Sequence, residues 1–83
     1  MRLVDLPSGQ SATVVDVHAQ SGLRTRLVEF GLRPGVVVMS RQRCSGGGRM
    51  IQVGNARLAL DRAALALIDV DVHQVETDQG MTL

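Results

Sequence analysis

The stretch RLVEFGLRPGVVV, residues 26–38, is the most informative part of the sequence about the fold, because a helical pattern changes to a strand pattern within it. Apolar residues at helical spacing predict a helix that turns one stripe towards a core: Leu23, Leu27 and Phe30. Gly31 is the natural left-handed end of that helix, and Pro34-Gly35 is a turn signal. The valines at 36–38 then begin a strand, so the connection first of all aims this strand at the core.

Strand signals recur on both sides of this connection. Segments rich in β-branched or alternating residues predict five short strands: 12–19, 36–43, 50–53, 56–61 and 66–73. The segment CSGGGR, residues 44–49, predicts a hairpin tip, and Gly54-Asn55 predicts a two-residue hairpin turn. Asp61 is expected to cap one short helical turn that ends at Ala64. Five closely connected strands with one inserted helix favour a small closed or partly closed barrel, since closure protects sheet edges.

Two finer expectations concern the first strand and the helix that follows it. Alternation places Val15 and Val17 on one face of the strand and Asp16 and His18 on the other. Ser21 is expected to be the N-cap of the helix, because a serine oxygen can accept a hydrogen bond from the first helical turn.

The composition limits the kinds of partner. The chain has 83 residues, which suits one small domain, and we place it at 1–73 with a polar tail at 74–83. A net charge of +1 argues against a strongly basic nucleic-acid surface. Phe30 is the only aromatic residue, so aromatic platforms for proline-rich peptides or single-stranded nucleic acid are excluded. The longest apolar runs, such as 36–39, are far shorter than a membrane-spanning helix.

The order of these signals resembles the ferrous iron transport protein A (FeoA) family. Three segments carry the resemblance: LVDLPSGQSATVVDV (3–17), LRTRLVEFGLRPGVVV (23–38) and RLALDRAALALIDV (57–70). The resemblance implies a five-stranded SH3-like barrel whose first and last strands pair antiparallel. It also implies a non-catalytic, cytoplasmic accessory of bacterial ferrous iron uptake, which a membrane Fe(II) transporter of the FeoB type recruits to the inner membrane. The contact would include the transporter's cytosolic GTP-binding domain, and a weak homodimer stays open as well.

The helix and its turn are the predicted partner surface. The residues concerned are Arg24, Arg26, Arg33, Gly31 and Gly35. Arginine is enriched at interfaces and makes bidentate contacts with carboxylates, although a charged face is also the ordinary solvent side of a helix. Glu29 is placed to pair with Arg33 or with Arg26 on this face.

The alternative function is a metal-sensing or metal-carrying protein. If the first and last strands pair, their outward polar residues adjoin: Asp16, His18, Asp69, Asp71 and His73. Imidazole and carboxylate ligands suit a divalent transition ion such as Fe2+ or Zn2+. The spacing of these residues is not diagnostic, and alternation alone already requires a polar outer face. We therefore expect that no cofactor is required and that any metal is bound at the surface.

Two further features do not predict chemistry. The triplet Gly46–Gly48 lies between strands and lacks the helix start of a phosphate-binding loop, so a hairpin tip is favoured. Cys44 cannot form an intramolecular disulfide as the single cysteine, and its predicted position is far from a histidine that could activate it. We expect no enzymatic activity.

Overall fold

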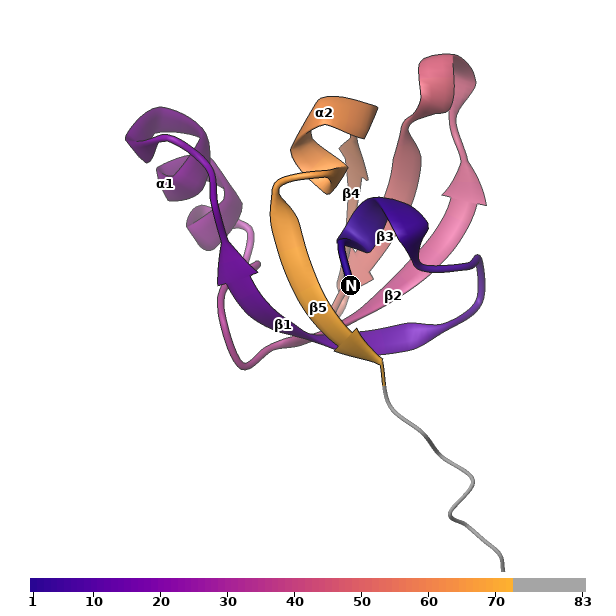
Figure 1. Cartoon of the computed structure of the whole chain (residues 1–83), viewed down its shortest axis with the longest axis horizontal. Helices are drawn as coiled ribbons and strands as arrows, with labels where there is room; N and C mark the ends of the chain where they lie inside the picture. Colours follow the sequence, from indigo (N-terminus) through magenta and orange to yellow (C-terminus); the bar gives the residue numbers. More distant parts are fainter. Residues whose placement is uncertain (73–83) are drawn as a thin grey trace, which may run out of the picture.

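The computed structural model describes residues 1–72, which form one antiparallel sheet of five strands with two α-helices (Figure 1). His73 and the predicted tail at 74–83 lie outside the described residues. Two short 3-10 segments, η1 and η2, complete the structure. The elements in chain order are η1 (Leu3–Asp5), β1 (Ser11–Val17), α1 (Ser21–Glu29), β2 (Val37–Arg43), η2 (Ser45–Gly47), β3 (Arg49–Val53), β4 (Ala56–Leu60), α2 (Arg62–Leu65) and β5 (Ile68–Val72).

The sheet has the strand order β4-β3-β2-β1-β5, and every neighbouring pair is antiparallel. Strands β4 and β5 are its two edges, and α2 connects them along the chain. Within residues 1–72 no pairing joins the two edges, so the barrel is only partly closed. The predicted fold is confirmed: mainly β, with five strands, one inserted helix and a helical turn before the last strand.

The core is aliphatic, as the composition predicts. Its buried side chains come from every strand, from both α-helices and from η1: Leu3, Leu6, Ala12, Val14, Val17, Leu27, Leu32, Val38, Ile51, Val53, Leu60, Ala64, Leu65, Ile68 and Val70. The start of the chain belongs to this core through Leu3 and Leu6, and the Val70 N–H donates to the Met1 carbonyl at 2.7 Å. The N-terminal segment is therefore held against β5 by backbone pairing as well as by burial.

A bulge in β1 corrects the predicted alternation. Val14 and Asp16 lie opposite consecutive residues of β5, so Val15 is an extra residue in β1. An extra residue reverses the alternation beyond it and bends the strand. Val17 is buried, but Val15 is 53% exposed. The prediction that these two valines share a face is wrong.

The end of α1 has the predicted glycine geometry. Gly31 has a φ of +93°, and its N–H donates to the Val28 carbonyl at 2.8 Å. The next N–H, of Leu32, donates to the Leu27 carbonyl at 2.9 Å. These two hydrogen bonds form a Schellman motif, which is completed by the apolar contact expected between Leu27 and Leu32, both buried.

The predicted turn at Pro34-Gly35 is also present. The Val36 N–H donates to the Arg33 carbonyl at 3.2 Å, and Gly35 has a φ of +94°. A positive φ at the third residue of a turn is the geometry that favours glycine there. The chain then enters β2, so the turn does aim a strand at the core.

Two details of α1 differ from the sequence prediction. The N-cap is Gln20, without a side-chain hydrogen bond, and Ser21 is the first helical residue. Phe30 is the C-cap residue and is 52% exposed, so it is not a core residue. Of the predicted apolar stripe, Leu27 is buried and Leu23 packs partly buried against the core.

The other predicted turns are confirmed. The Cys44 N–H donates to the Gly48 carbonyl at 2.9 Å and closes the tip between β2 and β3. Gly54, with a φ of +59°, begins the turn between β3 and β4. The Asp61 carboxylate accepts a hydrogen bond from the Ala64 N–H at 2.8 Å and caps α2.

Arg49 of β3 is a buried charged residue that the sequence analysis missed. It is 8% exposed, and its Nη1 donates to the Leu6 carbonyl and, at 3.1 Å, to the Ser40 hydroxyl. The sequence signal for its burial is its position two residues before the apolar Ile51, because alternate residues of a strand share a face. Arg49 thus joins the N-terminal segment to the inner face of the sheet.

Candidate functional site

An open groove of about 360 Å³ lies between α1, β4 and α2. Figure 1 shows the two helices at the same end of the sheet. Most of the groove lining is aliphatic: Leu23, Arg26, Leu27, Phe30, Leu58, Ala59, Leu60, Asp61, Ala63, Ala64 and Leu67. Half-exposed Phe30, the only aromatic residue of the chain, is part of the α1 wall. Sequence reasoning missed this groove because its walls come from segments about thirty residues apart along the chain.

A second hollow of about 390 Å³ adjoins the groove, since Leu23 and Leu67 line both. Its other lining residues are His18, Gln20 and Gly22, at the junction of β1 and α1. The apolar groove therefore continues towards a polar region at the end of β1.

The residues predicted to contact a partner lie on α1 and on the turn that follows it: Arg24, Arg26, Arg33, Gly31 and Gly35. All three arginines are exposed, but only Arg26 lines the groove. Among the described residues no ion pair within 4.0 Å joins Glu29 to Arg26 or Arg33, so the predicted pairing is absent. The geometry of the helix end and of the turn explains both glycines, and the contact of all five residues with a partner stays a prediction.

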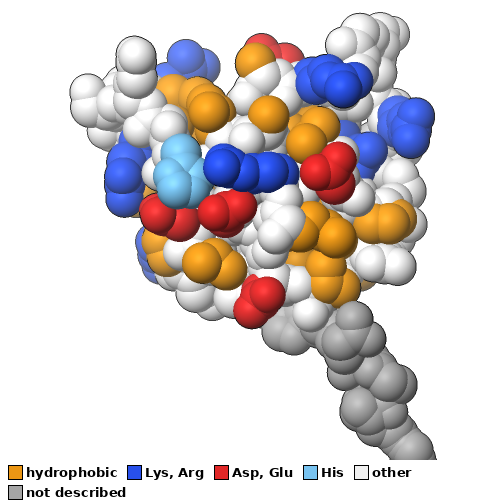
Figure 2. Space-filling model, viewed as in Figure 1, with side chains coloured by type: hydrophobic (Ala, Val, Ile, Leu, Met, Phe, Trp, Pro, Cys, Tyr) orange, Lys and Arg blue, Asp and Glu red, His pale blue; other side chains and the backbone are white. Residues whose placement is uncertain are grey.

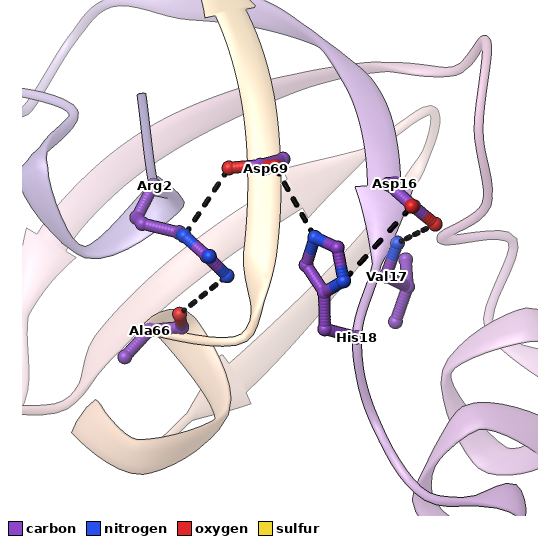
Figure 3. A network of polar contacts seen from close by, with 6 residues as sticks. All are labelled: Arg2, Asp16, Val17, His18, Ala66 and Asp69. Atoms are coloured by element: carbon purple, nitrogen blue, oxygen red, sulfur yellow. Dashed lines mark hydrogen bonds and ion pairs between the residues drawn. The ribbon is translucent and has the colours of Figure 1, made fainter.

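A polar network joins the ends of β1 and β5 to the start of the chain (Figure 3). Asp69 accepts at one oxygen from the Arg2 Nε at 3.2 Å and faces the His18 Nε2 with the other, also at 3.2 Å. His18 Nδ1 lies 3.9 Å from an oxygen of Asp16. Arg2 also donates from Nη1 to the Ala66 carbonyl at 3.2 Å. The network thus crosses from β1 to β5 and holds the N-terminal segment beside them.

This network lowers the pKa of Asp69 below its ordinary value. The hydrogen bond from His18 is the largest cause, and the charges of Arg2 and His18 act in the same direction. Partial desolvation of the carboxyl acts against them. The ionised form of Asp69 is therefore the form that the folded protein stabilises.

The described residues do not assemble a metal centre. No group of three or more histidine, cysteine or acidic side chains within residues 1–72 is arranged to hold an ion. Both oxygens of Asp69 already have partners in Arg2 and His18. Asp71 is exposed on β5, where it lies opposite Thr13. Since His73 lies outside the described residues, the predicted ligand set that includes it stays a prediction.

The rest of the surface is mixed in character. Figure 2 shows acidic, basic and apolar side chains interspersed on one face of the molecule, without a large area of one charge. Cys44 is a half-buried free cysteine beside the glycine tip, and no hydrogen bond to its thiol is present within residues 1–72. None of the helices in that range has the length and the apolarity that crossing a membrane requires.

The fold and these surfaces define a small SH3-like β-barrel with an open apolar groove. The chain belongs to the FeoA domain family, whose sequence model matches residues 1–72. Membership of this family implies a role in ferrous iron transport. The resemblance seen in the sequence is thus confirmed over nearly the same residues.

Solved structures support the assignment. The chain is 34% identical to FeoA of Stenotrophomonas maltophilia, a prokaryotic SH3 domain protein whose crystal structure is a zinc complex; the match has a TM-score of 0.73 and covers 86% of this chain and 89% of that one. It is 25% identical to the FeoA protein of Chlorobium tepidum, with a TM-score of 0.85 over 92% and 73% of the two chains.

An iron uptake regulatory protein, also FeoA, is 25% identical, with a TM-score of 0.79 over 88% of this chain and 97% of that one. The comparison with curated proteins gives no match. The three solved structures of the same family confirm the predicted SH3-like barrel.

Proposed function

We propose that this protein is a non-catalytic accessory of bacterial ferrous iron uptake that acts by contact with the membrane Fe(II) transporter. The observation that carries the proposal is the match to the FeoA domain over residues 1–72. The described residues support it because they hold an apolar groove and accessible arginines that a protein partner can contact. The protein works in the cytoplasm and reaches the inner membrane through its partner.

The contact is with the cytosolic GTP-binding domain of the transporter, and its effect is a shift between conformations. A bound protein shifts such an equilibrium only by the ratio of its affinities for the two states. A tenfold preference for one nucleotide state corresponds to about 1.4 kcal/mol of coupling. The accessory therefore needs only a modest preference to change the population of the transport-competent state.

The test is a binding titration of the full chain with the detergent-solubilised transporter, once with GDP and once with a non-hydrolysable GTP analogue. We expect saturable binding whose Kd differs between the two nucleotide states. Equal affinity in both nucleotide states would refute the proposed shift between conformations and leave only the contact. Absence of binding in both states would refute the whole proposal.

A double variant tests the predicted arginine surface. Arg24→Glu combined with Arg26→Glu changes two exposed side chains, so the fold is expected to survive while transporter binding weakens. Circular dichroism reports the fold of the variant. Undiminished binding by a folded double variant would remove this helix face from the contact.

A further inference from the structure

We propose that the α1–β4 groove receives an extended segment of the transporter that is both aliphatic and acidic, and that this segment adds to the sheet as a strand beside β4. The inference rests on the proposed function, because it specifies how the partner contact is made. It goes beyond that function by assigning the surface, the backbone conformation of the bound segment and its chemistry.

The edge of β4 is available for pairing. Within residues 1–72 β4 is hydrogen-bonded to β3 alone, so alternate residues of β4 direct their N–H and C=O groups away from the sheet. Three consecutive residues of this strand, 58–60, line the groove. Side chains alternate between the two faces of a strand, so a lining by three successive residues means that the edge itself borders the groove.

Such an edge is a known template for another chain. Natural proteins protect exposed edges with proline, bulges or several charges, whereas β4 has the sequence ARLAL and a regular register with β3 from end to end. Arg57 is the only charged residue within the strand. Main-chain pairing along this edge supplies affinity, and the pockets beside it select the side chains of the bound segment.

The opposite wall supplies an apolar anchor. Phe30 is 52% exposed on the groove side of α1, and aromatic residues in partly formed pockets dominate the binding energy of many interfaces. Leu23 and Leu67 continue the apolar lining. Aliphatic side chains on one face of an added strand would therefore pack between β4 and Phe30.

The charge of the groove specifies an acidic segment. Arg26 lines it and Arg57 lies on its edge strand, and neither forms an ion pair within residues 1–72. Asp61 is the acidic lining residue, and one oxygen of its carboxylate accepts the hydrogen bond of the Ala64 N–H that caps α2. The two arginines outweigh its single negative charge, so the groove and its edge strand are net positive. Carboxylates flanking the aliphatic residues of the segment would satisfy both arginines.

The experiment uses the ¹⁵N-labelled full chain and overlapping synthetic peptides that cover the cytosolic segments of the transporter, with the solubilised transporter as the reference ligand. Backbone resonances of β4 and α1 are followed during the titration, and amide hydrogen exchange is measured with and without the ligand. A strand added at the edge slows exchange at alternate amides of β4, because those N–H groups gain partners. A partner helix in the groove would shift the same resonances without this alternating protection, and that result would overturn the inference.

Variants identify the surface. Phe30→Ser removes the anchor, Ala63→Arg fills the groove from an exposed position on α2, and each is expected to raise the Kd about tenfold or more. Arg26→Glu is expected to do the same, whereas Arg43→Glu is its matched control, since it makes the same charge change at an exposed arginine of β2 that lies outside the groove lining. We expect the control to alter the Kd less than threefold.

Two failures are distinguishable. If the unmodified chain does not bind the transporter, the proposed function fails and the groove inference fails with it. If the transporter binds but the three groove variants bind as well as the control, the function stands and only the groove is wrong.

Discussion

Replacing Gly31 by alanine tests the helix end that begins the decisive connection. Gly31 has a φ of +93°, where a residue with a Cβ atom is disfavoured by about 1–2 kcal/mol. The added Cβ would lie 3.6 Å from Val53 Cγ1, which is an ordinary contact, so steric overlap adds nothing. Alanine also restricts the unfolded chain, which offsets about 0.4–1 kcal/mol. The expected net loss is about 1 kcal/mol, or about 4–8 °C in Tm for a domain of this size.

The matched control is Gly22→Ala in the same helix. Gly22 is exposed, its Cβ would meet no atom within 4 Å, and its φ is not positive. Alanine has the higher helix propensity, so this variant should gain up to about 1 kcal/mol. Urea unfolding followed by circular dichroism suits both variants, because the chain has no tryptophan or tyrosine.

The two variants must change the free energy of unfolding in opposite directions. Gly31→Asn adds a third point, since asparagine tolerates the left-handed region better than alanine, and its stability should lie between that of Gly31→Ala and the parent. A Gly31→Ala variant as stable as the parent, alongside a stabilised Gly22→Ala, would refute the assignment of Gly31 to a left-handed helix end.

Three further predictions concern other local features. Asp61→Ala removes the cap of α2 and should lower the free energy of unfolding, measured in urea, by about 0.5–2 kcal/mol. Asp61→Asn should retain most of the stability that the cap contributes, since asparagine is also a good N-cap. Gly48→Ala would place a Cβ 2.8 Å from the Leu60 carbonyl oxygen, so it should destabilise by about 1–3 kcal/mol and shift the amide resonances of the hairpin tip; an unchanged spectrum would contradict the contact. Because the pKa of Asp69 is lowered on folding, its contribution is complete above its unfolded pKa of about 3.9 and is lost as pH falls through the folded value. Asp69→Asn should flatten this part of the stability profile measured by urea unfolding from pH 7 to pH 2.

The sequence predicted those parts of the fold that depend on local backbone chemistry. Gly31 and Gly35 require positive φ, Asp61 caps the turn that follows it, and Gly54 begins a two-residue hairpin. Each signal acts within four residues of its effect, so neighbouring sequence alone contains the information. The alternation in β5 is equally local, and it placed Val70 in the core.

The misses depend on residues that are distant along the chain. Val15 is an extra residue because of the register between β1 and β5, which no pattern within β1 reveals. Arg49 is buried and donates a hydrogen bond to the Leu6 carbonyl, and the two residues are 43 positions apart. The groove was not predicted for the same reason. The helical spacing of Phe30 predicts a position that faces the core, and only the position of β4 shows that Phe30 lines an open groove instead.

The exposure of Phe30 and the stability of the helix end have separate causes, which makes the groove testable. The apolar pair expected to accompany the Schellman motif is Leu27 and Leu32, both of which are buried in the core. Phe30 stands between them in sequence but turns half of its surface to the solvent. Its removal therefore costs the fold much less than burial of a phenylalanine would contribute, about 3–5 kcal/mol for a core site. A folded Phe30→Ser chain that has lost its partner would consequently report on binding rather than on unfolding.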